Sequence, residues 1–165
     1  MKNKTRNDVK SLTKVGITAA LYVVLTLVVA PFSFGAFQFR VSEIFNHLID
    51  LNKRYIWALT IGCAIANMAS PLGPIDILVG TSGTLISGLL IYAINKHVSN
   101  LKAKLAVSTI IPTVVGMIPI ALELHYVQHL PFWLTYGTSM VGEIISCLVG
   151  AFLVYGLSKR IDLTK

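Results

Sequence analysis

Residues 15–31 read VGITAALYVVLTLVVAP, a stretch without one charged side chain. A helix over these residues would cover most of the roughly 30 Å hydrocarbon core of a bilayer. The whole chain of 165 residues has the same character, with 55% hydrophobic and only 13% charged residues. About a quarter of the residues of a soluble domain are charged, and a fold of this size could not bury so much apolar surface. The sequence therefore predicts an all-α, polytopic membrane protein.

Apolar segments recur along the chain, and one of them is unusually short. They lie at about Val15–Pro31, Val41–Leu51, Tyr55–Ala69, Ile75–Asn95, Leu105–Leu122 and Trp133–Leu157. They predict six transmembrane helices. The second segment is too short to cross a bilayer as an α-helix, so the non-helical stretch Phe32–Arg40 must complete it. Irregular backbone at membrane depth is tolerated only beside protein or a water-filled cavity. We therefore expect Phe32–Arg40 to line a cavity.

The basic residues set the expected orientation. They cluster before the first segment, between the second and third, between the fourth and fifth, and after the sixth. All of these positions fall on one side in a six-span arrangement, and Arg40 alone falls on the other. The positive-inside rule then predicts that the N- and C-termini are cytoplasmic. Residues 1–14 form a cytoplasmic segment, 15–157 the membrane domain and 158–165 a cytoplasmic tail.

The net charge of +7 does not indicate a nucleic-acid-binding face, because the basic residues are dispersed between apolar runs. The first apolar run is also longer than the core of a cleaved secretory signal, which is about 7–15 residues.

Ionisable residues inside membrane segments are costly and are candidates for function. Here they are Arg40, Glu43, Asp76 and Glu143, with the neutral Asn67 as a companion. Counting helical residues from the nearest basic cluster places the side chains at about 15 Å (Glu43), 20 Å (Asn67), 24 Å (Glu143) and 30 Å (Asp76) above the inner boundary. This convergence in the outer half predicts a substrate cavity that opens outward. Phe37 and Phe39, beside Arg40, are candidate lids or walls of that cavity.

These polar groups could instead serve only the fold. Arg40 and Glu43 are three residues apart and could pair on a helix, and Asp76 could cap the helix after Pro74. One arginine cannot neutralise three carboxylates, however. The unpaired acids would be protonated or would bind a cationic or N–H-rich ligand, and we expect a ligand site.

Small residues on the first helix offer a surface for a partner. Gly16 and Ala20 form a small-xxx-small pair, widened by Ala19, which allows close helix packing in lipid. The same spacing also serves packing within the chain. The sequence contains no GxxxxGK[ST], HExxH or GxSxG motif, so we expect no ATPase or other enzymatic activity of its own. We expect no cofactor and no metal, since His125 and His129 read as interfacial loop residues.

Three longer runs carry a family resemblance. They are GITAALYVVLTLVVAPFSFGAFQFRVSE at 16–43, IGCAIANMASPLGPIDILVGTSGTL at 61–85 and VGEIISCLVG at 141–150. In order and spacing they resemble the QueT family, the substrate-binding (S) components of energy-coupling factor (ECF) transporters associated with uptake of queuosine precursors. The likeness covers nearly all of residues 15–157.

The resemblance implies a multi-pass protein of a bacterial cell membrane. It would bind a 7-deazaguanine on the outer side and dock through Gly16 and Ala20 on the coupling protein EcfT, which two cytoplasmic ATPases drive. Glu143 and Glu43 are the first candidates to accept the guanine-like N–H groups, Asp76 is the third, and Arg40 or Asn67 would donate to the carbonyl. An S component for another vitamin-like solute and a membrane scaffold that transports nothing are the alternatives.

Overall fold

The computed structural model describes residues 2–35 and 37–159, with side chains from Val9 onward. The elements are α1 (Lys2–Val28), α2 (Ala30–Ser33), the 3₁₀-helix η1 (Val41–Asp50), α3 (Arg54–Asn67), α4 (Pro74–Asn95), α5 (Leu101–Ile111), the π-helical turn η2 (Pro112–Gly116), α6 (Met117–Gln128) and α7 (Phe132–Ser158). The described residues contain no β-strand, so the all-α prediction is confirmed.

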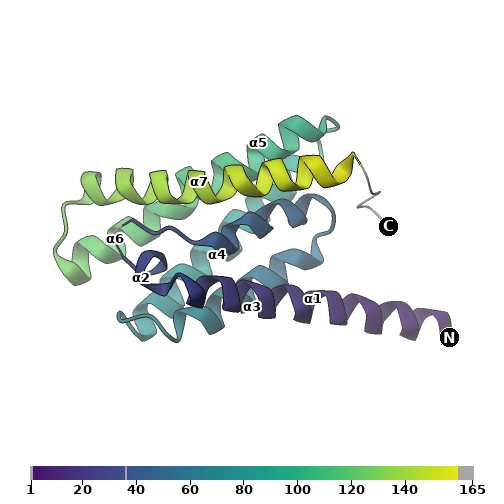
Figure 1. Ribbon diagram of the computed structural model, residues 1–165, viewed down its shortest axis with the longest axis horizontal. Helices are drawn as coiled ribbons and strands as arrows, with labels where there is room; N and C mark the ends of the chain where they lie inside the picture. The colour runs from purple at the N-terminus through teal and green to yellow at the C-terminus, as the bar shows by residue number, and fades with distance from the viewer. Residues whose placement is uncertain (1, 36, 160–165) are drawn as a thin grey trace.

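The helices form an elongated bundle in which the start of α1 and the end of α7 lie at the same end (Figure 1). α1 packs mainly on α3, α3 on α4, and α7 on η1 and α6. η1 lies in the middle, in contact with α1, α3, α4, α5 and α7. Its residues Ser42, Glu43, Asn46, His47 and Ile49 are buried. The second apolar segment of the sequence is therefore the central element of the bundle.

Four helical segments of the described chain are long and apolar enough to cross a membrane: Val9–Val28, Pro74–Asn95, Leu101–Gln128 and Phe132–Ser158. η1 and α3 are shorter. The ten residues of η1 nevertheless extend about 20 Å, because a 3₁₀-helix rises about 2.0 Å per residue. The 14 residues of α3 extend about 21 Å.

Local sequence features explain where the helices begin, end and bend. Gly73, at φ 64°, ends the turn before α4, and Pro74 opens that helix. Asn100 caps α5 by accepting a 2.9 Å hydrogen bond from the Lys102 backbone N–H. Pro112 opens the π-helical turn between α5 and α6.

The bundle has an apolar exterior as well as an apolar interior. Tyr22, Leu59 and Ile91 are buried in its core. Trp57, Trp133 and Phe152 have between 59% and 79% of their surface exposed. An exterior of this kind suits contact with lipid rather than water.

A polar cluster joins η1, α4 and α5 near the end of the bundle where α1 begins and α7 ends (Figure 1). Ser108 Oγ donates to the Asp50 carboxylate, 2.9 Å from each of its oxygens. Asn95 Nδ2 donates to Asp50 Oδ1 at 2.5 Å and lies 3.2 Å from the Lys104 carbonyl. These bonds hold three elements together where apolar packing alone would leave a buried carboxylate unsatisfied.

Candidate functional site

A small cavity of about 20 Å³ lies in the middle of the bundle. η1, α4, the α5–η2–α6 segment and α7 surround it. It is lined by Arg40, Glu43, Asn46, Gly80, Gly83, Thr84, Ser87, Pro112, Gly116, Met117, Ile120 and Glu143. Three of the sequence-predicted site residues (Arg40, Glu43 and Glu143) thus meet at one place, although they are as many as 103 positions apart in the sequence.

Arg40 precedes η1 and is only 2% exposed. Its Nε donates to the Ser33 carbonyl at 3.2 Å, and its Nη2 lies 3.8 Å from Asp76 Oδ1. Its ion-pair partner is therefore Asp76 on α4, and the local pairing with Glu43 that the sequence allowed is not formed. Asp76 does not cap α4 with its side chain either. The ion pair connects the start of η1 to the start of α4.

Glu43 and Glu143 differ in how well the protein satisfies them. Glu43 accepts hydrogen bonds from the Tyr22 hydroxyl and, at 2.7 Å, from Asn46 Nδ2. Glu143 is fully buried, and the thiol of Cys147 lies 3.4 Å from its Oε1. Its Oε2 makes no hydrogen bond within the described chain. Glu143 therefore has more free accepting capacity than Glu43.

Other buried polar atoms around the site also make no hydrogen bond with the residues that the structure describes. They are Arg40 Nη2, Asn67 Oδ1, Asp76 Oδ2 and Ser87 Oγ. Leaving a buried polar group unsatisfied costs about 1–3 kcal/mol. Water or a bound ligand could satisfy such atoms.

Asn67 lies beside the cavity lining, and its amide is largely occupied. Its Nδ2 donates to the Asp76 carbonyl at 2.9 Å and lies 3.5 Å from Cys63 Sγ. A methyl group on Gly80 would overlap that Nδ2, so the glycine leaves room for the amide. Asn67 thus offers only its Oδ1, an acceptor. Of the two residues that we expected to donate to a ligand carbonyl, Arg40 is the better candidate.

The segment before η1 is irregular, as predicted, apart from the short α2. Phe37 and Phe39 do not line the cavity, and 42% of the Phe37 surface is exposed. The Phe37 carbonyl packs so closely on Gly142 of α7 that a methyl group there would overlap it. Gln38 has φ 47°, which is uncommon for a residue other than glycine. The segment is thus seated on α7, with the two phenylalanines outside the cavity.

Sequence reasoning missed several polar residues of this region. Asn46, Thr84 and Ser87 line the cavity, but neutral polar residues carry little weight in a hydropathy pattern. Glu123 was not among the candidate residues. It is buried on α6, it interacts electrostatically with Asp76 and Arg40, and its Oε1 has no hydrogen-bond partner in the described residues. Its position in an apolar stretch was a signal that could have found it.

The small residues of α1 divide into two groups. Gly16 and Ala20 are exposed, and a methyl group on Gly16 would touch no atom within 4 Å. Ala19 is buried, and its carbonyl lies 3.1 Å from the position of a Cβ on Gly62 of α3. Ala19 therefore serves packing inside the chain, and it does not widen an exposed patch as we had expected.

Comparison with known proteins identifies the family of this chain. The model of the QueT transporter family matches residues 12–159. The Queuosine precursor transporter QueT of Lactococcus lactis subsp. cremoris (strain MG1363) is 39% identical over 159 residues, covering 92% of this chain and 94% of the relative. No solved structure matches. The chain therefore belongs to the QueT transporter family.

Proposed function

We propose that this chain is the substrate-binding S component of an ECF importer and captures a queuosine precursor of the 7-deazaguanine type. The name of the Lactococcus relative supports the substrate class. The polar cavity inside a bundle with an apolar exterior supports a transport role without enzymatic activity. ATP-driven uptake would then rest on EcfT and two cytoplasmic ATPases, because the sequence has no phosphate-binding loop.

The proposed topology has six crossings, with both termini in the cytoplasm of a bacterial cell. η1 and α3 would complete the six. Each extends about 20 Å, less than the roughly 30 Å core, so flanking non-helical residues, such as Phe32–Arg40 before η1, would complete these crossings. The positive-inside rule supports the orientation, since the basic clusters of the sequence fall on one side of the six expected segments and Arg40 alone falls on the other.

The observation that carries the substrate proposal is that Glu143 Oε2, Arg40 Nη2 and Ser87 Oγ line one cavity without hydrogen-bond partners in the described chain. A guanine-like base presents a ring N–H and an exocyclic amine side by side, which one carboxylate can accept together. Glu143 is our candidate for that role, and Arg40 would donate to the base carbonyl. An aminomethyl ammonium would be matched by Glu43, Asp76 or Glu123.

The cavity is too small to hold the proposed substrate in this conformation. A volume of about 20 Å³ holds about one water molecule, and a bicyclic base needs much more space. Binding therefore requires surrounding elements to separate. The Phe37–Arg40 segment is our candidate for the moving part. It covers α7 at Gly142 and is linked to the site through Arg40.

Docking on EcfT is assigned to the exposed Gly16 and Ala20 of α1. A face of small residues lets a partner helix approach closely in lipid, where van der Waals packing drives association.

The function is tested by purifying the chain in detergent and measuring its thermal unfolding with a panel of solutes. We expect the aminomethyl and nitrile forms of 7-deazaguanine to raise the midpoint, and guanine and unrelated vitamins to raise it less. Stabilisation by another vitamin and not by any 7-deazaguanine would favour an S component for that solute. If no solute had an effect, the scaffold alternative would be favoured.

A further inference from the structure

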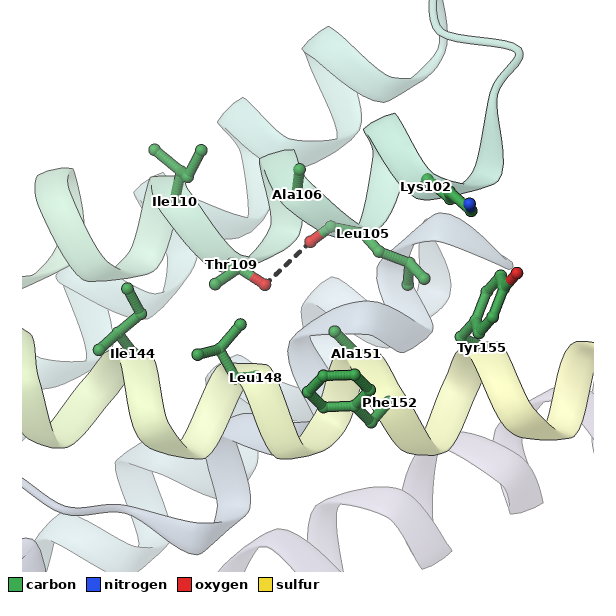
Figure 2. Close-up of a pocket in the computed structure, with 10 residues that line it drawn as sticks. All are labelled: Lys102, Leu105, Ala106, Thr109, Ile110, Ile144, Leu148, Ala151, Phe152 and Tyr155. Carbon is green, nitrogen blue, oxygen red and sulfur yellow. Dashed lines mark hydrogen bonds between the residues drawn. The ribbon is translucent and has the colours of Figure 1, made fainter.

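A groove of about 460 Å³ runs between α5 and α7 on the exterior of the bundle (Figure 2). Its lining shares no residue with that of the polar cavity. Its walls are the side chains of Leu105 and Ile110 on α5, and of Ile144, Leu148 and Phe152 on α7. Of these, Ile110, Ile144, Leu148 and Phe152 are each at least 37% exposed. The groove is thus an open apolar channel on the outside of the bundle.

The hydroxyl group in the middle of the groove is not available to a ligand. Thr109 Oγ1 donates to the Leu105 carbonyl at 2.9 Å, as Figure 2 shows, and it also lies 3.2 Å from His47 Nε2. Two partners within the protein satisfy it. The groove therefore suits hydrocarbon along most of its length.

One end of the groove is positively charged. Figure 2 places Lys102 and Tyr155 together at this end. Lys102 Nζ lies 5.9 Å from the centroid of the Tyr155 ring, and Lys159 Nζ lies 4.6 Å from the same centroid. Two ammonium groups near one aromatic ring make this end of the groove cationic, and a cationic end attracts an anion.

The dimensions of the groove match one leaflet of a bilayer. Lys102 and Ile110 are eight residues apart on one helical segment, which is about 12 Å, and Tyr155 and Ile144 are eleven apart, which is about 16 Å. Half of a hydrocarbon core of roughly 30 Å is about 15 Å. The charged end then lies at the level of the headgroups, and the apolar part spans the depth of one leaflet.

We propose that this groove binds an anionic phospholipid of the cytoplasmic leaflet. Its phosphate lies between Lys102 and Lys159, and one acyl chain lies between α5 and α7. Basic pockets between transmembrane helices on the cytoplasmic side recognise such headgroups. The inference takes only the membrane orientation from the proposed function.

A phospholipid fits better than a helix of a partner protein. Lys102 lines one end of the groove, and Lys159 approaches the Tyr155 ring at that end from outside the lining, which matches a ligand with one charged head and a long apolar tail. α1, which carries the proposed docking residues, packs on α3, and this pair lies along the opposite side of the bundle in Figure 1. A partner that covers α1 would therefore leave the α5–α7 groove exposed to lipid.

The test is native mass spectrometry of the full chain in detergent, titrated with dioleoylphosphatidylglycerol or dioleoylphosphatidylcholine. We expect the anionic lipid to bind at least fivefold more tightly. The double variant Lys102→Ala with Lys159→Ala should lose most of that preference, with a fall of about 30-fold in affinity for phosphatidylglycerol if each lysine contributes about a factor of five. The matched control is Lys53→Ala with Lys96→Ala, which removes two lysines at the same end that line a different cavity.

A third variant tests the acyl chain. Ala106→Phe places a large side chain in the groove from an exposed position, and it should weaken both lipids. Equal phosphatidylglycerol affinity in the two lysine double variants, or unchanged affinity in Ala106→Phe, would overturn the proposal. Binding of 7-deazaguanine by the same preparations is measured separately, so loss of the lipid site and failure of the proposed function can be told apart.

Discussion

Arg40 Nη2 lies 3.8 Å from Asp76 Oδ1 inside the bundle, and the two residues are each only 2% exposed. A buried ion pair gains its attraction at a large cost in lost hydration, so removing one partner leaves an uncompensated charge. This pair also connects the start of η1 to the start of α4, beside the cavity. The arrangement couples stability of the fold to the electrostatics of the site.

We therefore predict strong coupling between these two residues. Arg40→Gln alone or Asp76→Asn alone should lower the free energy of unfolding by about 3 kcal/mol. The double variant should lose clearly less than the sum, because neither charge remains without its partner. Reversible unfolding in mixed micelles measures the cycle. Additive losses would show that the pair is not a unit.

The contact between Phe37 and Gly142 gives a second prediction. Gly142→Ala would force the Phe37 carbonyl away from α7, at a cost of about 1–3 kcal/mol. It should also change substrate affinity if the Phe37–Arg40 segment covers the site. Gly137→Ala on the same helix is the control, because its methyl group meets nothing within 4 Å. Equal stability and equal affinity of the two variants would contradict the assigned role of this contact.

Ser108 is predicted to stabilise the opposite end of the bundle. Ser108→Ala removes the hydroxyl that donates to Asp50 and should cost about 1–3 kcal/mol. Ser82→Ala is a matched control, since that hydroxyl is exposed and bonds only to the Val79 carbonyl of its own helix at 2.9 Å. Thermal unfolding of the two variants in one detergent compares them, and the same midpoint for both would refute the assignment.

The two groups of small residues on α1 should behave differently. Gly16→Leu with Ala20→Leu should leave the isolated chain folded and weaken its co-purification with EcfT and the ATPases, because both positions are exposed. Ala19→Leu should instead destabilise the chain by about 1–3 kcal/mol through overpacking against α3. Unchanged assembly of the double variant would remove Gly16 and Ala20 from the docking face.

Much of this architecture could be predicted from the sequence, because hydropathy, helix-breaking residues and charge act locally. The helical segments, the turn before Pro74 and the irregular lead into η1 follow from such features. The sequence also predicted that Arg40, Glu43 and Glu143 lie close together, because ionisable side chains in membrane segments face the interior of the bundle or a water-filled cavity.

The rest depends on tertiary packing, which spacing does not encode. Arg40 pairs with Asp76 and not with Glu43 because η1 is a 3₁₀-helix that begins only after Arg40. Phe37 lies outside because its backbone packs on a glycine of a distant helix. Glu123 was missed because the expected fifth segment ended at Leu122, whereas α6 continues to Gln128.

The most direct test of the central claim is calorimetric titration of the purified chain with the aminomethyl form of 7-deazaguanine, comparing Glu143→Gln with wild type. We predict saturable binding by wild type and a loss of at least about tenfold in affinity for the variant, since hydrogen bonds to a charged group contribute about 1.5–3 kcal/mol. The control is Asp50→Asn, which also replaces a carboxylate by an amide. Asp50 is the last residue of η1 and does not line the cavity, so this variant should bind as wild type does. No binding by wild type, or equal affinity in Glu143→Gln, would contradict the account.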